Sequence, residues 1–553
     1  MPRYNDMDEV PDLIKSKLAR FISNVGGRTF VIQGLPPELT GGALARYSRA
    51  KTGMQLTLLN EFFDENGEPN QEKGSALMDR VLNAFGDDSV GELEGTHLGI
   101  EDVSQLLTKF IEDRRIGGSP IEQSTRYVMY DQKDKDGKWR YLRPKEIQGS
   151  KFIGKFELVN DRCFEVYSKA IGLLTEFFKK QFPREEFQIE VERNSQKTKA
   201  FENELFNEVE IKSFNNAYSF TIRCAALDVG RCVLPSSTLT HLGIFGNGRF
   251  FSNLISTLKS QDLMESVDRG FEIEAELKKV IPTFVKRNKA NPKMPEINKN
   301  MAIISSNLLG KIKPEANSVT LIQRASRLDE VAASCLFPYT NISLKQIIDR
   351  LRNYPDEIKI NIIKNYAGQR DTRRDRTGRA AETGYPITFD LVGGFAEYRD
   401  LERHRMLTQQ RQPLTTELGF IMPPEMKMIG MEKEVEEVVS MMEELHQELK
   451  AAGLRNAAQY TTLFNHRMRF MLGMNFRELQ HLTELRTQPA GHFSYRAMCQ
   501  EMARQVMARD PWTKQLLAFV DFSDPGNKIS RAKEQSRIAG KNIATGTDSS
   551  LDL

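Results

Sequence analysis

The sequence predicts an α+β fold, mainly helical, arranged as two tandem copies of one domain. Apolar residues recur at helical spacing in most segments, and only short strand-like stretches separate them. A similar series of parts also occurs in each half of the chain. The hydrophobic content of 39% and the charged content of 28% are those of an ordinary globular protein.

Helical periodicity and capping residues place individual elements. Val435, Val438 and Met442 share one helix face, and Gly453 follows as a C-terminal cap. Asn160 is predicted to cap a helix that ends before Pro183. The segments assigned on this basis are helices over 101–113, 160–181 and 432–452, and a hairpin over 127–142 with its turn near Asp136 and Gly137.

Composition suggests where the domains begin and end. A stretch rich in Lys, Asn and Pro is predicted to be a linker, and the polar, glycine-containing end of the chain is predicted to be mobile. The basic run 371–379 is most simply a solvated loop. The predicted divisions are an N-terminal extension 1–29, a first domain 30–274, a linker 275–315, a second domain 316–522 and a tail 523–553.

Several classes of protein are disfavoured. A net charge of +3 gives no polyanion-binding signature, so a nucleic-acid partner is not expected. The polar N-terminus and the lack of a long apolar run argue against a signal peptide and a membrane span. Five cysteines without a CxxC pair fit a reducing cytoplasm. Seven scattered histidines without a ligand spacing predict no metal.

The repeat consists of a helix, a cationic helix end, a polar loop and an Asn-x-Arg segment that opens another helix. Its parts are RRIGGSPIEQSTRY (114–127) and GRCVLPSSTLTHLGIFGNGRFFSNLISTL (230–258) in the first half, and RHRMLTQQRQPLTTE (403–417) and NHRMRFMLGMNFRELQHLTELR (465–486) in the second.

Three groups of polar residues suit an anion. Ser124 and Arg126 alternate with Glu122 on one side of an extended segment, where a hydroxyl beside a guanidinium can hold a phosphate. A solvated loop with a Glu–Arg pair is the simpler interpretation of these residues alone. The other groups are the Asn-x-Arg pairs at helix starts, where free N–H groups favour a diphosphate, and the RHR run at 403–405, expected at an exposed helix end. Ordinary surface helices are again the simpler alternative.

Together these motifs resemble the flavin-dependent thymidylate synthase family. RHR at 403–405 is similar to the start of the family's RHR-x7-S signature, and residues 122–127 are similar to its E-x-S-x-R-Y end. GRCVLPSSTLTHLGIFGNGR is similar to the segment from A-R-x-x-L-P to N-x-R, and LGMNFRELQHLTELR to the following helix. The resemblance covers most of 30–270 and 316–510, and implies a fused double copy of a domain with a small sheet flanked by long helices.

The resemblance implies an enzyme, a methyltransferase that converts dUMP to dTMP by reductive methylation at C5. Methylenetetrahydrofolate would give the carbon, and NADPH would reduce bound FAD. The family unit is a homotetramer, so a fused chain is expected to form a homodimer. Two alternatives stay open: a flavoenzyme that methylates another pyrimidine nucleotide, and a nucleotide- or FAD-binding paralogue without turnover.

The two copies depart from the family pattern in opposite places. Leu258 stands where the first copy should have its helix arginine, and Gln459 stands where the second should have its substrate arginine. Asp400 occupies a position where the family usually has Gln. One complete site between a first and a second copy is therefore implied. Its residues by role are Arg486 and Arg403 for catalysis; Glu122, Ser124, Arg126, Arg231, Arg403 and Arg486 for the nucleotide; and Arg403, His404, Arg405, Glu122, Asn247, Arg249, Asn253, Asn475, Arg477 and His481 for FAD.

Overall fold

The computed structural model forms two compact units, each assembled from discontinuous segments. Unit 1 comprises Met1–Gln123, Pro144–Gly149 and Leu239–Ile312, and unit 2 comprises Ser124–Arg143, Ser150–Thr238 and Lys313–Leu553. No helix in the described part of the chain is long and apolar enough to cross a membrane. The described residues are 4–47, 50–79, 91–114, 116–193, 196–286, 288–290, 303, 317–322, 327–336, 344–367, 379–383 and 387–545.

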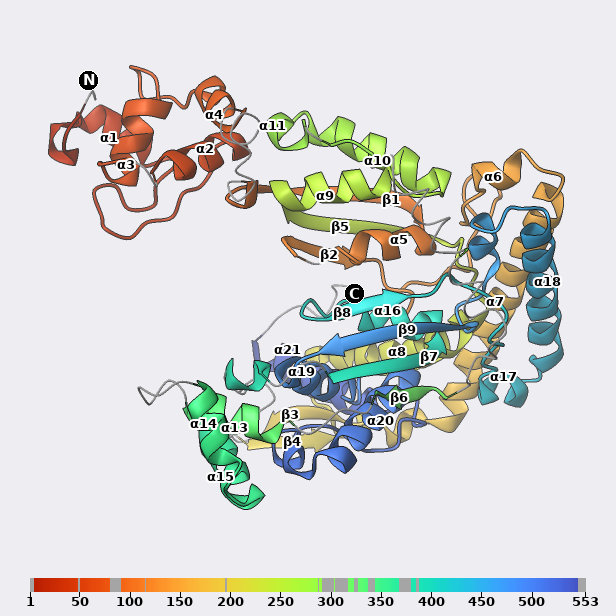
Figure 1. Ribbon diagram of the computed structural model, residues 1–553. Coiled ribbons are helices and arrows are strands. Elements are labelled where there is room, and N and C mark those ends of the chain that lie inside the picture. The colour runs from red at the N-terminus through yellow and green to blue at the C-terminus, as the bar shows by residue number, and fades with distance from the viewer. Residues whose placement is uncertain are drawn as a thin grey trace. The chain divides into compact units, whose positions relative to one another are not determined.

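Unit 1 is built around a three-stranded antiparallel sheet in the order β1-β5-β2. Helix α5 and helix α9 each contact the sheet, and α10 packs on α9 (Figure 1). Apolar residues of the strands and these helices form one core, which includes Val103, Leu107, Leu242 and Phe251. The elements are β1 Gly95–Ser104, α5 Gln105–Glu112, β2 Gly118–Glu122, α6 Lys145–Gln148, β5 Leu239–Asn247, α9 Gly248–Leu258, α10 Met264–Leu277 and α11 Pro282–Val285.

The N-terminal part of unit 1 is a small helical subassembly with its own apolar cluster. Leu18 and Ile22 pack in this cluster with Leu39 and Phe63. The predicted extension 1–29 is therefore packed with the residues that follow it. The elements are η1 Met7–Glu9, α1 Asp12–Leu18, α2 Pro37–Tyr47, α3 Met54–Thr57, η2 Leu58–Phe62 and α4 Gln71–Met78.

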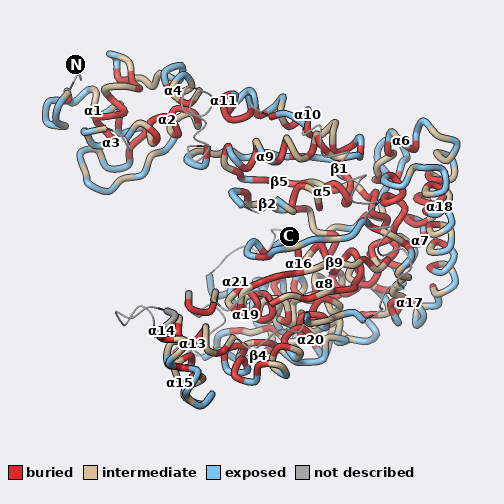
Figure 2. The backbone as a smooth tube through the Cα atoms, viewed as in Figure 1, coloured by how far each residue is buried: buried red, intermediate tan, exposed pale blue. Residues whose placement is uncertain are grey.

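Unit 2 contains a four-stranded antiparallel sheet in the order β6-β7-β9-β8. Its central strands β7 and β9 are largely buried (Figure 2). The strands and the helices of the same segment are β6 Val319–Leu321, α13 Leu328–Leu336, α14 Leu344–Leu351, α15 Asp356–Ala367, η9 Arg379–Glu382, β7 Ile387–Gly394, α16 Phe395–Leu401, β8 Thr408–Arg411, α17 Pro424–Met428, α18 Glu432–Ala451, η10 Ala457–Thr461, β9 Arg467–Met474, α19 Phe476–Arg486, α20 Phe493–Arg509, η11 Pro511–Gln515 and α21 Ala532–Thr545.

Unit 2 also holds the long helices of the first copy. Helix α7 packs along α8 and also against α18 of the second copy. A short antiparallel ribbon, β3 and β4, connects α7 to α8. These elements are α7 Ile153–Gln181, η5 Arg184–Glu186, β3 Ile189–Arg193, β4 Gln196–Ala200, η6 Glu202–Glu204, α8 Glu208–Gly230 and η7 Arg231–Val233.

The two sheets repeat one topology. In the first copy β1 leads into α5 and β2, and β5 leads into α9; in the second, β7 leads into α16 and β8, and β9 leads into α19. The orders β1-β5-β2 and β7-β9-β8 correspond strand for strand. Asn247 and Asn475 occupy equivalent N-cap positions. The predicted α+β fold in two tandem copies is therefore confirmed.

The compact units do not follow the predicted division at 275–315. Helices α7 and α8 belong to the first copy in sequence, yet they lie in unit 2. The first residues of the predicted linker are structured, because α10 continues to Leu277 and α11 buries Phe284 and Val285 in the unit 1 core. Residues 287, 291–302 and 304–315 of that segment lie outside the described residues, as do 371–378 of the predicted basic loop.

The predicted hairpin over 127–142 is wrong. Residues 127–142 form a turn with Gly137 at φ 74°, but no strand ladder, because Tyr141 instead bridges to Thr238. The described part of the predicted tail, up to residue 545, contains helix α21, which packs on α8 and β3.

Helix boundaries also shift from the predicted ones. Helix α7 begins at Ile153, and Asn160 lies buried inside it, donating to the carbonyl oxygen of Phe156 at 2.7 Å. Residues 101–104 extend β1, and Ser104 caps α5. Helix α18 matches its prediction closely, and Gly453 follows it at φ 83°.

Candidate functional site

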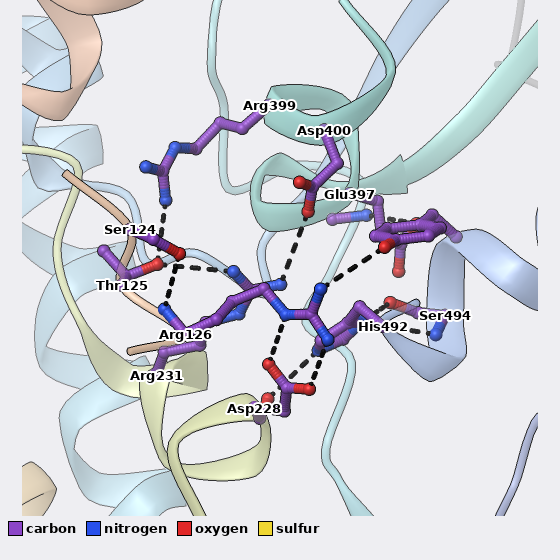
Figure 3. Close-up of polar contacts among 12 residues, drawn as sticks. Ser124, Thr125, Arg126, Asp228, Arg231, Glu397, Arg399, Asp400, His492 and Ser494 are labelled. Atoms are coloured by element: carbon purple, nitrogen blue, oxygen red, sulfur yellow. Dashed lines mark hydrogen bonds and ion pairs between the residues drawn. The ribbon is translucent and has the colours of Figure 1, made fainter. Parts of the chain in front are cut away.

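Unit 2 gathers a cluster of arginines from both copies, which we call the arginine cluster. Arg126 follows β2 in sequence, Arg231 directly follows α8, Arg399 lies on α16 and Arg486 ends α19. Figure 3 shows Arg126 and Arg231 side by side, with the carboxylates of Asp228 and Asp400 approaching from opposite sides. The cluster is defined as Thr125, Arg126, Asp228, Arg231, Arg399, Asp400 and Arg486, all residues of unit 2.

Arg126 is fully engaged within the protein. Its Nε and Nη2 donate to the two carboxylate oxygens of Asp228, each at 2.7 Å. Its Nη1 donates to the Tyr495 hydroxyl at 3.3 Å. Burial opposes both charges, but mutual attraction outweighs it: the pKa of Arg126 is raised above its ordinary value and the pKa of Asp228 is lowered. Arg126 therefore acts as part of the scaffold of the site.

Arg231 is equally buried but incompletely paired. Only 2% of the residue is exposed. Its Nη1 donates to the Thr125 hydroxyl at 3.3 Å, and its Nη2 lies 3.9 Å from Oδ2 of Asp400. Among the described residues, its Nε and Nη2 have no hydrogen-bond acceptor. Burial lowers the pKa of Arg231. A buried guanidinium with unused donors is suited to an anionic ligand.

Helix α16 supplies the opposite wall of the cluster. Arg399 is buried and donates from Nη1 to the Thr125 hydroxyl at 3.2 Å. Burial raises the pKa of Asp400, but Arg231, Arg126 and further arginines lower it to about 2. The arginines of the cluster thus outnumber its two ionised carboxylates, and the formal excess of positive charge favours an anionic ligand.

His404 was expected at an exposed helix end, and this expectation is wrong. The residue is 4% exposed because α19 packs over it. Its Nδ1 lies 2.7 Å from Oε1 of Glu478, and its Nε2 accepts from Nε of Arg486 at 3.0 Å. Burial lowers the pKa of His404 to about 4, so the imidazole is neutral at pH 7. Removing His404 is therefore expected to affect folding as well as binding.

His404, Glu478 and His481 form a group that could hold a metal ion, although no ligand spacing in the sequence indicated a metal. Their potential ligand atoms lie within 4.8 Å of one another, and two histidines with one carboxylate suit a divalent transition metal. The hydrogen bond from Arg486 to Nε2 of His404 opposes this use. It places the ring proton on Nδ1, the atom that faces Glu478.

A buried chain of polar groups leads from α16 to Asp228. Glu397 is 6% exposed and contacts the Ser494 hydroxyl. Oγ of Ser494 donates to Nδ1 of His492 at 2.6 Å, and Nε2 of His492 donates to the carbonyl oxygen of Asp228 at 3.1 Å. Burial raises the pKa of Glu397 to about 7 and lowers that of His492 to about 3. This chain fixes the backbone that carries Asp228.

The C-terminal segment lines the same region. Arg531 donates to the carbonyl oxygen of Ala490 at 2.6 Å and to the Tyr127 hydroxyl at 3.1 Å. Arg126 donates to the same Ala490 carbonyl at 3.3 Å. Two buried arginines thus share one acceptor, which ties the chain end to the arginine cluster.

The predicted site residues are divided between the units. In unit 2 the structure brings Ser124, Arg126 and Arg231 of the first copy together with elements that carry Arg403 and Arg486 of the second. Ser124 itself accepts from the backbone N–H of Arg126 at 3.3 Å. The predicted residues of unit 1 are Glu122, which is buried against Thr108 and Lys109; Asn247, which caps α9; Arg249, which pairs with Glu92; and Asn253, which is exposed.

Other predicted residues have structural partners in unit 2. Asn475 caps α19 by accepting from the N–H of Glu478 at 2.9 Å, and Arg477 pairs with Glu382. Two of the positions that depart from the family pattern have structural roles: Leu258 is fully buried in the unit 1 core, and Gln459 accepts from the N–H of Leu414 at 3.2 Å.

Sequence reasoning missed the residues that complete the cluster. Thr125 lies between Ser124 and Arg126 and could have been included with them. Asp228 lies three residues before Arg231, and Arg399 lies one helical turn before Arg403. No local signal marks Tyr495 or Arg531, because each reaches the cluster only through tertiary packing.

Comparisons with known proteins agree with the arrangement in two copies. The family model described as thymidylate synthase complementing protein matches residues 37–283 and 376–512. A UPF0159 protein of Chlamydia muridarum is 34% identical over 95% of this chain and 97% of its own length. UPF0159 proteins of Chlamydia pneumoniae and Thermoplasma acidophilum are 35% identical (92% of this chain, 95% of the relative) and 29% identical (90% and 99%), respectively. The chain therefore belongs to the thymidylate synthase complementing protein family.

Proposed function

We propose that this chain is a flavin-dependent thymidylate synthase that binds dUMP at the arginine cluster of unit 2. The observation that carries the proposal is the buried guanidinium of Arg231, whose Nε and Nη2 lack acceptors among the described residues. Methylenetetrahydrofolate and NADPH are the proposed co-substrates. The proposed assembly is a cytoplasmic homodimer with one nucleotide site per chain.

In this proposal the phosphate of dUMP binds Arg231. Thr125 and Arg399 lie on the opposite side of the arginine cluster, and the Arg126–Asp228 pair holds the segment that carries Thr125. The charge-assisted hydrogen bonds from Arg231 orient the nucleotide before reaction. Arg486 and Arg403, both within electrostatic reach of Asp400, approach the uracil and stabilise charge that develops on it.

The donor set of unit 2 fits the anionic part of FAD in part. Arg403 and Arg405 are exposed on either side of the buried His404, and two guanidinium groups suit a diphosphate. His404 does not fit as a direct ligand, because both its ring nitrogens have partners. FAD, when bound, supplies the hydride chemistry of the reductive methylation. The protein's own residues bind, orient and stabilise charge.

One observation favours the two alternatives, a nucleotide-binding paralogue without turnover and a flavoenzyme that methylates another pyrimidine nucleotide. The Asp400 carboxylate lies 3.9 Å from Nη2 of Arg231 and is held ionised. It partly satisfies the charge that a phosphate would meet, and it repels a dianion. A substrate with less negative charge, or weaker binding of dUMP, would follow from this arrangement.

Two measurements test the proposal. Calorimetric titration with dUMP should give about one site per chain, and Arg231→Met should weaken that binding. NADPH oxidation by the FAD-loaded protein should require dUMP and methylenetetrahydrofolate. dUMP binding without dUMP-dependent oxidation would favour the non-catalytic paralogue, and no dUMP binding would contradict the assignment of the site.

A further inference from the structure

We propose that Glu478 and His404 are positioning residues that hold Arg486, as a fully charged guanidinium, at the edge of the arginine cluster. We call the hydrogen-bonded series Glu478–His404–Arg486 the relay. Its role in nucleotide binding rests on the function proposed above, whereas the relay itself rests only on contacts within unit 2. Glu478 lies on the first turn of α19 and Arg486 ends the same helix, while His404 follows α16.

The proton positions of the relay follow from its hydrogen bonds. Arg486 has only N–H donors, so Nε2 of His404 must accept, at 3.0 Å. The single proton of the neutral ring is then on Nδ1, which donates to Oε1 of Glu478 at 2.7 Å. Glu478 is fixed in turn, because its backbone N–H is capped by Asn475 at 2.9 Å. Each group in the sequence Glu478–His404–Arg486 thus has one defined role.

The neutral imidazole has a chemical consequence for Arg486. Arg126 donates directly to a carboxylate, so most of its charge is compensated at contact distance. Arg486 donates to an uncharged nitrogen, and the nearest negative charge in this relay is one ring further away on Glu478. The two guanidinium groups lie near the same Tyr495 ring, at 5.9 and 5.7 Å from its centroid. The charge of Arg486 is therefore compensated less closely than that of Arg126, although Asp400 lies within its electrostatic reach, and more of it is left for an anionic ligand.

The relay explains the His404–Glu478–His481 group better than a metal does. A metal at Nδ1 of His404 needs the lone pair on that atom, which moves the ring proton to Nε2. The N–H on Nε2 would then face the N–H of Arg486, and two donors cannot form a hydrogen bond with each other. Burial is the largest cause of the lowered pKa of His404, and the cation of Arg486 lowers it further. A divalent cation would add charge beside this arginine.

The first test concerns the tautomer of His404 in the full-length protein. Long-range ¹H–¹⁵N spectra at pH 7, with His404 assigned by His404→Gln, are expected to show a neutral ring protonated on Nδ1. A ring protonated on Nε2, or a cationic ring, would overturn the relay. So would a metal shift, in which added Zn²⁺ moves the signals of His404 and His481 together.

The second test separates the two hydrogen bonds of His404. Glutamine can place an acceptor near the position of Nε2, whereas asparagine reaches only the position of Nδ1. His404→Gln is expected to keep the Kd for dUMP within about threefold, and His404→Asn to raise it about tenfold. His446→Gln is the matched control, since His446 is a buried histidine of unit 2 that contacts the Ala458 carbonyl.

The outcomes distinguish the relay from the proposed function. Thermal unfolding first confirms that each variant is folded. Equal binding by the Gln and Asn variants would overturn the positioning role. If the wild-type protein binds neither dUMP nor inorganic phosphate, the proposed function fails, while the spectra still decide whether the relay exists.

Discussion

Replacing Arg231 with methionine should leave the ligand-free protein at least as stable as wild type, yet remove most of its affinity for phosphate. Arg231 is 2% exposed, and two of its nitrogens lack acceptors among the described residues. Burying a guanidinium whose nitrogens lack acceptors is costly, and an apolar side chain of similar length avoids that cost. Asp400 keeps Arg126, Arg486 and Arg403 as nearby cations in the variant. Each lost charge-assisted contact costs roughly 1.5–3 kcal/mol of binding, so Kd for dUMP should rise about tenfold or more.

Arg126→Met is the matched comparison. Arg126 is also buried, but both oxygens of Asp228 accept from it at 2.7 Å. Breaking this pair leaves an uncompensated carboxylate and should lower the free energy of unfolding by about 3–5 kcal/mol. Urea denaturation followed by circular dichroism measures both variants, and calorimetric titration with dUMP measures binding. Equal destabilisation by the two substitutions would refute the distinction between a paired and an incompletely paired guanidinium.

Three further predictions concern charge and the chain end. Asp400→Asn should tighten phosphate binding, because it removes a negative charge near the phosphate. The pKa of Asp400 is lowered to about 2, so its carboxylate contributes about 2 kcal/mol to the free energy of unfolding above pH 4, and this contribution is lost as the pH falls toward 2. Acid denaturation of the variant should lack that loss. The pKa of Glu397 is raised to about 7, so the folded state binds the proton more tightly and wild-type stability should fall as the pH rises from 4.5 to 7, by up to about 3 kcal/mol; Glu397→Gln should remove this slope in denaturation curves measured across that range. Deleting residues 523–553 should lower the free energy of unfolding, because Arg531 donates to Ala490 and α21 packs on α8 and β3. Trypsin should cut the wild-type protein slowly within residues 528–541, and rapid cleavage there would indicate a mobile tail.

The strand–helix units of both copies follow from the sequence because their signals are local. Asn247 and Asn475 cap the helices that follow β5 and β9, and the apolar spacing of α18 defines its buried face. The motifs around Ser124, Arg231 and the RHR run also identified the family and the cationic residues of the site. Each of these features depends on residue types within one or two helical turns.

Only the tertiary structure decided which of those cations are paired. Arg126 meets Asp228 across 102 residues, and Arg399 meets Thr125 across 274. His404 looked exposed because its own segment is polar, but α19 buries it and gives its ring two partners. Whether a charge is compensated depends on groups that are distant in sequence and on how far water is excluded. For this reason the sequence motifs identify the arginines of the site but not their pairing. The fold distinguishes Arg126, which supports the site, from Arg231, which has donors left for a ligand.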